Sequence, residues 1–292
     1  MNRPLRACAA ALALLLPIWA VADGGHHTLW AVHGRHNTVY LLGSVHVLKP
    51  EDSALPAEAE AAYQHAQTLV LEVAVDQAFA PDALRAAMLA QGTLPAGRTL
   101  RGELGDALYA RLGERSRSFG LDAAWLDRLR PWLAALLLQQ AELAHAGYAA
   151  EAGVDLQIAR QAQADRKAVI GLETLDEQFG LFAQLTDAQQ REFLARTLAE
   201  LDDLDTQAGD IVAAWRAGDT RGLEAALHKS RAESPELFRV LTTDRNRRWL
   251  PQILGLLEHD EDCLVIVGAL HLVGREGLVA LLEQRGFHPV QQ

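Results

Sequence analysis

The sequence of 292 residues predicts an α/β protein with a central mixed sheet and a large helical cover. Short apolar runs of the kind that form buried strands occur near both ends of the chain, at 28–46, 68–75 and 263–271. Segments with helical spacing of apolar residues lie between them, at about 82–165 and 174–259. No Pro- or Ser-rich linker divides the chain, so we expect one α/β domain over residues 23–292.

Residues 1–22 have the pattern of a cleaved signal peptide. Arg3 and Arg6 form a basic start, an apolar stretch follows over 7–21, and the small residues "AVA" end at position 22. The apolar stretch is short for a membrane span of about 20 residues, and no stop-transfer flank follows it. We therefore expect a periplasmic or secreted protein with no stable membrane anchor after cleavage.

The first elements of the mature chain are predicted from local signals. Two strands, over 28–33 and 38–46, are separated by "GRHN", whose Gly34 and Asn37 suit a tight hairpin. An alanine-rich segment at 55–67 has helical spacing and precedes a third strand over 68–75. Together they predict a strand–helix–strand unit.

The later elements follow the same logic. After the first helical block, a short apolar run at 167–173 predicts another buried strand. The second helical block leads to the strand at 263–271, a final helix at 275–286, and a possible last strand at 287–292.

The composition excludes some classes of partner. The chain carries a formal net charge of −11 at pH 7, which argues against nucleic acid and against anionic membranes. Its two cysteines, Cys8 and Cys263, provide no disulfide framework, because the first lies in the predicted signal peptide.

One short pattern occurs twice. "LLGSVHVL" at 41–48 and "IVGALHLV" at 266–273 are both an apolar strand followed by Gly-x-x-His and an apolar pair. Gly43 and Gly268 allow the backbone to turn or approach a neighbour closely, and His46 and His271 follow at the strand ends. The repeat suggests that two related halves share one sheet.

Carboxylates end two further strands: Glu72 closes "TLVLE" and Glu173 closes "AVIGLE". Ligands of open α/β sheets bind at the carboxyl ends of the strands, so we expect these side chains to lie together at that edge of the sheet. Two imidazoles and a carboxylate form a common ligand set for a catalytic divalent metal, here His46, His271 and Glu72. Such a metal lowers the pKa of its water to about 7 and polarises a carbonyl, as hydrolysis of an amide or ester requires.

Alternatives remain open at this point. A histidine after Gly-x-x is more often a hydrogen-bonded turn residue than a ligand. Glu173 could be a further ligand, a general base or a residue that orients a ligand. The segment "TTDRNRRWL" at 242–250 predicts a helix whose basic face is either solvated or directs Arg245 and Asn246 into the cleft. An arginine there could clamp a carboxylate or stabilise an oxyanion.

Several ordered segments resemble the TraB/GumN family, also called TraB/PrgY/GumN and related to the TIKI proteins, and most closely its bacterial GumN-type branch. The resemblance covers nearly the whole mature chain. The segments are "YLLGSVHVL" with its downstream "LP", "LVLEV", "RPWLAAL", "GVDLQIARQAQADRKAVIGLETLDEQ", "DRNRRW" and "LVIVGALHLVGREGLVALLEQRGF". It implies a fold of the TIKI and erythromycin-esterase-like kind. The family's site pattern falls on Gly43, His46, Glu72, Arg245, Asn246, Gly268 and His271.

The expected function is that of an exported, metal-dependent hydrolase resembling a metallopeptidase, with a peptide or protein as substrate. His46, His271 and Glu72 would hold the metal, which could be Zn, Mn or Co. Arg245, helped by Asn246, would stabilise negative charge, and Glu173 is a candidate general base. The alternative is a periplasmic protein that binds a peptide or signal in the same cleft without cutting it. We expect no C-terminal membrane anchor like that of animal TIKI proteins, so their substrate is not transferred.

Overall fold

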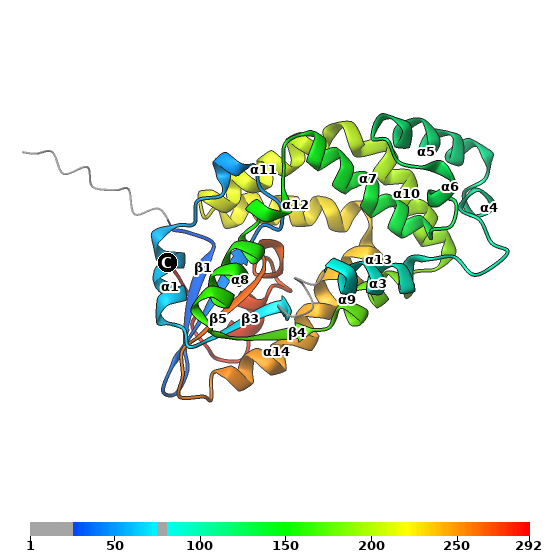
Figure 1. Cartoon of the computed structure of the whole chain (residues 1–292). Helices are drawn as coiled ribbons and strands as arrows, with labels where there is room; N and C mark the ends of the chain where they lie inside the picture. The colour runs from blue at the N-terminus through cyan, green and yellow to red at the C-terminus, as the bar shows by residue number, and fades with distance from the viewer. Residues whose placement is uncertain (1–25, 75–80) are drawn as a thin grey trace, which may run out of the picture.

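The computed structural model describes residues 26–74 and 81–292 (Figure 1). Six strands form one mixed sheet in the order β4-β3-β5-β2-β1-β6. This confirms the predicted α/β class and mixed central sheet. The predicted signal peptide at 1–22 lies outside the described residues. The strands are β1 (Leu29–His33), β2 (Thr38–Ser44), β3 (Thr68–Val73), β4 (Ala168–Glu173), β5 (Cys263–Gly268) and β6 (Val290–Gln291).

The sheet is antiparallel on one side and parallel on the other. β1 pairs with β2 in the predicted hairpin and with the short last strand β6, both antiparallel. β2, β5, β3 and β4 run parallel to one another. Since parallel strands end at the same edge, the chain segments that follow these four strands emerge side by side.

The two strands of the Gly-x-x-His pattern are direct neighbours. In the pairing of β2 with β5, Gly43 lies opposite Val267 and Ser44 lies opposite Gly268. A Cβ on Gly43 would come within 3.0 Å of the Cα of Ala269, so this glycine permits the close approach of the two segments. Segments more than 200 residues apart in the sequence therefore end together at one edge.

Helices make up most of the remaining chain. In the described part of the chain, seven helices bury side chains in the hydrophobic cluster around the strands: α1 (Ala57–His65), α8 (Val154–Asp165), α11 (Leu204–Arg216), α12 (Thr220–Glu233), α13 (Pro235–Phe238), α14 (Asp244–Leu256) and α15 (Leu278–Glu283). The others are α3 (Pro81–Gly92), α4 (Leu100–Leu104), α5 (Asp106–Ser118), α6 (Ala123–Leu126), α7 (Pro131–His145), α9 (Leu175–Ala183) and α10 (Asp187–Glu200).

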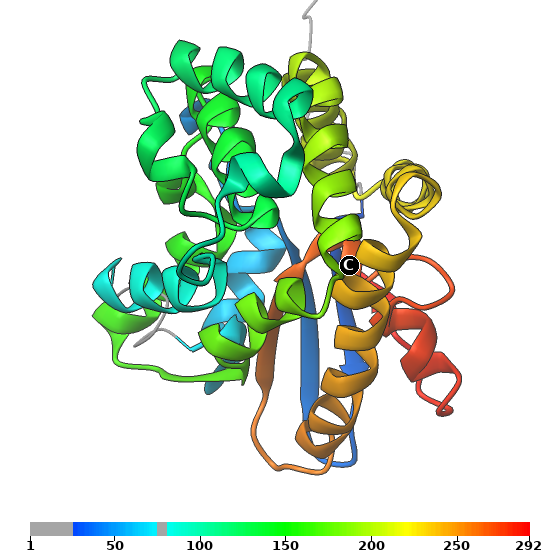
Figure 2. The ribbon, with the colours of Figure 1, turned by 90° about the vertical axis from the view of Figure 1, so that its right-hand side faces the viewer.

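The helices extend away from the sheet. Figure 1 shows α4, α5 and α6 farthest from the strands, and in Figure 2 the strands run through the lower half of the molecule with the green helices above them. Two hydrophobic clusters follow this division. One surrounds the strands and includes Trp249, and the other fills the helical part, where Trp132 stacks on Phe182 with ring centroids 4.8 Å apart.

Helix signals fix the segments that approach the strand ends. Thr174, directly after β4, starts α9 with a capping box in which its hydroxyl and Glu177 satisfy each other's backbone N–H groups. Pro131 begins α7 at a position where a missing N–H costs nothing.

Among the described residues, no helix is long and apolar enough to cross a membrane.

Candidate functional site

The structure brings most of the predicted site residues together at the carboxyl edge of the parallel strands. Glu72 lies at the centre of the group. Its Oε1 is 3.9 Å from Nε2 of His46, which follows β2, and 4.0 Å from Nε2 of His271, which ends the 3₁₀ turn η5 (Ala269–His271) after β5. Glu173 joins the group from the end of β4 through Arg245.

Arg245 lies among these carboxylates in the first turn of α14. Its side chain is only 8% exposed, and its Nη2 donates to both Glu72 Oε2 and Glu173 Oε1, the latter at 2.7 Å. Its Nε donates to Glu173 Oε2 at 3.3 Å, and the guanidinium lies 4.4 Å from the ring centroid of Trp249. Both glutamates are therefore paired with a buried cation, which is the condition for burying such charges.

A turn of π-helix, η4 (Arg239–Thr243), directly precedes α14. Such turns are rare and add a residue to the helical repeat, which re-aims the side chains that follow. The carbonyl of Leu241 in this turn accepts from Nη1 of Arg245 at 3.3 Å. The other Nη1 contact is with Nε2 of His271 at 3.1 Å. All five N–H donors of Arg245 thus have acceptors within the protein.

His271 is held as a neutral ring. Asn246 donates from Nδ2 to the carbonyls of His271 and Glu276, which turns its Oδ1 toward His271 Nδ1, 2.7 Å away. Nδ1 therefore donates the proton, and Nε2 carries the lone pair that accepts from Arg245. Burial, followed by the charge of Arg245, lowers the pKa of His271 to about 3.

Asn246 departs from the sequence-based expectation in one respect. We expected both Arg245 and Asn246 to point into the cleft, but only Arg245 lines the cavity. Asn246 is fully buried behind His271, and its amide is hydrogen-bonded to the His271 ring and to two backbone carbonyls. It can orient His271, but it does not reach a ligand.

His46 is held by a residue that the sequence reasoning did not single out. Nδ1 of His46 lies 2.8 Å from Oδ2 of Asp155, and Ser44 Oγ donates to the other carboxylate oxygen at 2.8 Å. The negative charge of Asp155 raises the pKa of His46, although the side chain is 60% exposed and water weakens this effect. Asp155 and Ser44 thus fix the direction of the His46 ring.

A signal for Asp155 was present in "GVDLQ". Gly153 precedes α8, and a Cβ at this position would lie 2.1 Å from the carbonyl oxygen of His46, so only glycine fits there. Val154 N–H also donates to the carbonyl of Val45 at 3.1 Å. The start of α8 is therefore packed against the segment after β2, and Asp155 in its first turn faces His46.

The two glutamates respond differently to the same cation. Burial raises the pKa of Glu72, but Arg245 and the two histidines outweigh this effect and hold it well below the usual value. Burial also raises the pKa of Glu173, and here the guanidinium only partly offsets it. Glu173 does not line the cavity; it is paired with Arg245 and, at 3.8 Å, with Arg248.

A cavity of about 470 Å³ opens beside this group. His46, Glu72, Asp155 and Arg245 line one end. The rest of its wall is mostly apolar and comes from both hydrophobic clusters, so the cavity lies where the sheet core and the helical core meet.

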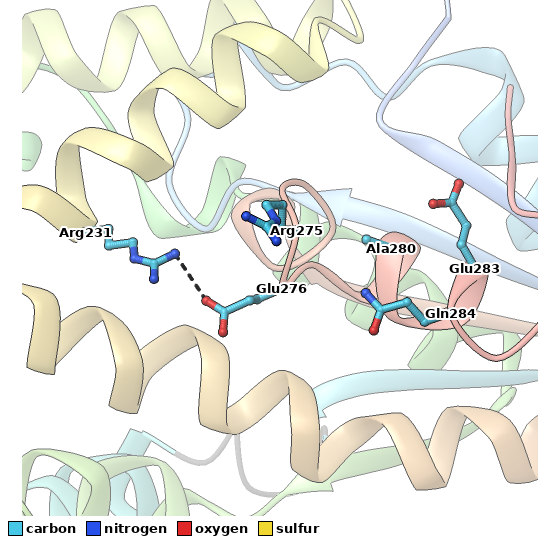
Figure 3. A pocket seen from close by; sticks show the side chains of 6 residues that line it. All are labelled: Arg231, Arg275, Glu276, Ala280, Glu283 and Gln284. Carbon is cyan, nitrogen blue, oxygen red and sulfur yellow. Dashed lines mark hydrogen bonds and ion pairs between the residues drawn. The ribbon is translucent and has the colours of Figure 1, made fainter.

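A larger hollow lies elsewhere on the surface and has a different character. Its volume is about 670 Å³, and it is lined by charged and amide side chains, with Arg231 paired to Glu276 at 3.4 Å (Figure 3). Glu283 and Gln284 extend from α15 on the other side of it. None of its lining residues belongs to the predicted site, so we place the candidate site in the smaller cavity.

The donor set can be compared with the needs of a divalent metal. Within residues 26–74 and 81–292, no three His, Cys, Asp or Glu side chains are spaced as a ready metal site. His46 and His271 nevertheless each engage Nδ1 with a side-chain oxygen and direct Nε2 toward Glu72 Oε1. That is the usual arrangement of metal-ligating histidines, whose second nitrogen is held by an acceptor.

The space between these groups is also open. Gly268 N–H donates to Glu72 Oε1 at 2.8 Å, and a Cβ on Gly268 would lie 3.4 Å from His46 Nε2 and 3.5 Å from Glu72 Oε1. Ligands of a tetrahedral metal are about 3.4 Å apart when each bond is about 2.1 Å. The donors fit a metal in type and direction, and binding would require them to close by about half an ångström and Arg245 to release His271 Nε2.

These features define an α/β protein with a charged site at the carboxyl edge of a mixed sheet. The model of the TraB/PrgY/gumN family matches residues 28–291, and the chain belongs to this family. It is similar to the uncharacterized protein YbaP of Shigella flexneri and to YbaP of Escherichia coli (strain K12). Each is 26% identical over 277 residues, which cover 91% of this chain and 96% of the relative. No solved structure matches the chain.

Proposed function

We propose that this protein is an exported, metal-dependent hydrolase that cleaves a peptide or protein in the cavity beside Glu72. The observation that carries the proposal is the convergence of His46 Nε2 and His271 Nε2 on the same oxygen of Glu72, at 3.9 and 4.0 Å. These are the three residues that would hold the metal. A bound divalent metal would supply an activated water and polarise the carbonyl to be attacked.

The chain's own residues have separate tasks in this proposal. Asp155 and Asn246 hold Nδ1 of the two histidines, so that each presents Nε2 to the site. The raised pKa of His46 means that a proton must leave this ring when it becomes a ligand. The exposed position of His46 at the cavity gives that proton access to water.

Arg245 is the candidate for stabilising negative charge on the substrate. It lines the cavity, but each of its N–H groups already has an acceptor. The Nη1–H that donates to His271 becomes free for a substrate oxygen when the His271 lone pair is engaged elsewhere. Oxyanion stabilisation of this kind depends on donors held in place beforehand, and Glu173 anchors Arg245 through both carboxylate oxygens. We therefore assign Glu173 to anchoring Arg245 and not to proton transfer.

The same cavity also supports a second candidate function. Most of its wall is apolar, and Glu72 is already paired with Arg245 within the protein, so the cavity is suited to hold a peptide or signalling molecule without cutting it. This binding function predicts saturable binding with no products and little effect of metal.

Export, and the relation of the fold to the TIKI and erythromycin-esterase-like proteins, belong to the same proposal. Export rests on the pattern of residues 1–22, and the relation of the fold rests on the family resemblance. Fractionation of cells that produce the full chain, with N-terminal sequencing of the product, tests export. Recovery in the periplasm or medium with Asp23 as the first residue is expected, whereas an uncleaved cytoplasmic product would contradict it.

The decisive experiment for function measures metal content and peptide cleavage together. Untagged mature protein, His46→Ala, His271→Ala and the surface control His228→Ala are purified and reconstituted with Zn, Mn or Co. We expect about one metal per chain in the wild type and the control, lost in both site variants together with cleavage of a peptide library. Cleavage that persists after chelation would assign water activation to the His46–Asp155 pair, and binding without products would favour the binding function.

A further inference from the structure

We propose that the apolar wall of the cavity is a subsite for a large apolar side chain of a peptide, next to the bond that the charged end acts on. This inference rests on the proposed function, because it names the substrate that the same site would select. The wall residues used in the argument are Val73 from β3, Leu136 from α7, Leu156 from α8, Phe179 and Phe182 from α9, and Leu241 from η4.

The charged end and the apolar wall belong to one continuous cavity. Its charged end, with His46, Glu72 and Arg245, and its apolar wall enclose one space of about 470 Å³. A ligand that reaches the charged end with a polar group therefore has its neighbouring group against the wall. Sites of this type, apolar with a few convergent polar groups, are typical of small ligands and of substrate side chains.

The apolar wall of the cavity is rigid and keeps apolar surface open to a ligand. Phe179 and Phe182 are buried on one face of α9, and both stack on Trp132 behind them, with centroids 6.3 and 4.8 Å away. They form a rigid surface held by the helical core. Leu136 and Leu156 are only partly buried, so they leave apolar surface that a ligand would cover. An aromatic or branched aliphatic side chain gains most from such a surface.

A weakly engaged amide in the wall favours a peptide over a fatty acyl chain. Gln178 lines the cavity with its Nε2 3.5 Å from Glu72 Oε2, a long contact that the amide can exchange for a backbone N–H or C=O. Asp155 and His46 line the same cavity but are engaged with each other. A fatty acyl chain presents no amide to pair with Gln178.

Helix α7 offers a matched pair of positions for the test. Leu136 lines the cavity, whereas its neighbour Leu137 packs against the helical core and does not line it, and both are half-buried. Leu136→Trp fills the subsite, and Leu137→Trp places the same bulk elsewhere on the helix. Leu136→Ala changes the subsite in the opposite direction and serves if the tryptophan variant does not fold.

The experiment measures binding, so it does not depend on cleavage. Dissociation constants are determined by calorimetry for acetyl-Gly-Gly-Phe-Gly-Gly-amide and for the same peptide with Ser at the central position. We expect the wild type and Leu137→Trp to bind the Phe peptide about tenfold more tightly. Leu136→Trp should reduce that preference to about twofold or less, and Leu136→Ala should lower it by a similar fraction.

The outcomes separate this inference from the proposed function. A preference for Phe that Leu136 controls, without any cleavage, supports the subsite and contradicts hydrolysis. Equal binding of the two peptides, or a preference for Phe that is unchanged in both Leu136 variants, overturns the proposed subsite even if peptides are cleaved. A third measurement uses 4-nitrophenyl acetate and octanoate: turnover of the octanoate controlled by Leu136, together with no peptide preference, would assign the wall to an acyl chain and overturn the peptide assignment.

Discussion

The two Gly-x-x-His segments begin with the same pattern and place their histidines in opposite environments. His46 has a side chain that is 60% exposed and a carboxylate partner, Asp155, and its pKa is raised. His271 is 9% exposed and has an amide partner, Asn246, and its pKa is lowered to about 3. The two rings nevertheless direct the same atom, Nε2, toward one oxygen of Glu72.

The comparison teaches that the motif sets the position of the ring and the tertiary partners set its charge. A carboxylate beside Nδ1 stabilises the protonated ring, whereas an amide oxygen and the nearby guanidinium of Arg245 do not. The site thus combines one histidine whose positively charged form is stabilised with one that is neutral. Four substitutions test which contacts maintain this difference.

The largest effect is expected from Arg245→Met. The change leaves Glu72 and Glu173 buried without their cation, so the free energy of unfolding should fall by about 3–5 kcal/mol. Urea denaturation measures the loss. Arg247→Met, two residues further along α14 and 63% exposed, should change stability by less than about 1 kcal/mol. Equal losses in the two variants would show that the carboxylates do not depend on Arg245.

Gly268→Ala tests the space between the two histidines. The new methyl group would meet His46, Glu72 and His271 at 3.4–3.6 Å, which are ordinary contact distances, so the fold should be retained. It would occupy the space that the proposed metal needs, and we expect metal affinity and activity to fall by about 100-fold. Gly255→Ala, with open space around its Cα, is the control. Unchanged metal affinity in the Gly268 variant would show that these residues do not hold the metal.

Asp155→Asn should reduce the difference in pKa between His46 and His271. Removing the charge that stabilises protonated His46 should lower the pKa of this ring toward its usual value. NMR titration of the imidazole protons measures the shift. The weaker orienting contact should also reduce metal affinity by about 10–100-fold. Asp205→Asn, which affects an exposed partner of Lys49, should change neither quantity. A His46 pKa that stays raised would assign the shift to another group.

Ser44→Ala should have the smallest effect. It removes one hydrogen bond to Asp155 but leaves the contact between Asp155 and His46 intact, so stability should fall by about 1 kcal/mol. Activity should fall by less than in Asp155→Asn. Thermal denaturation and peptide cleavage check this, with Ser118→Ala as an exposed control. A Ser44 variant as inactive as the Asp155 variant would make Ser44 part of the chemistry.

Much of the fold was accessible from the sequence. The six strands, the hairpin at Gly34 and Asn37, the two helical blocks and the final helix all follow from local signals, because periodicity and turn residues act over a few positions. The family could be identified for the same reason, since its segments are read directly from the chain. The pairing of β2 with β5 could not be derived from such signals.

The sequence by itself determined which side chains end the parallel strands: His46, Glu72, Glu173 and His271. Only the tertiary structure decided what each one meets. Asp155, more than 100 residues after His46, reaches it because Gly153 lets α8 pack on the segment after β2. Asn246 lies behind His271 and not in the cleft, because the start of α14 packs against η5. Such contacts depend on which elements become neighbours, and that is settled by burying the two hydrophobic clusters and not by any local pattern.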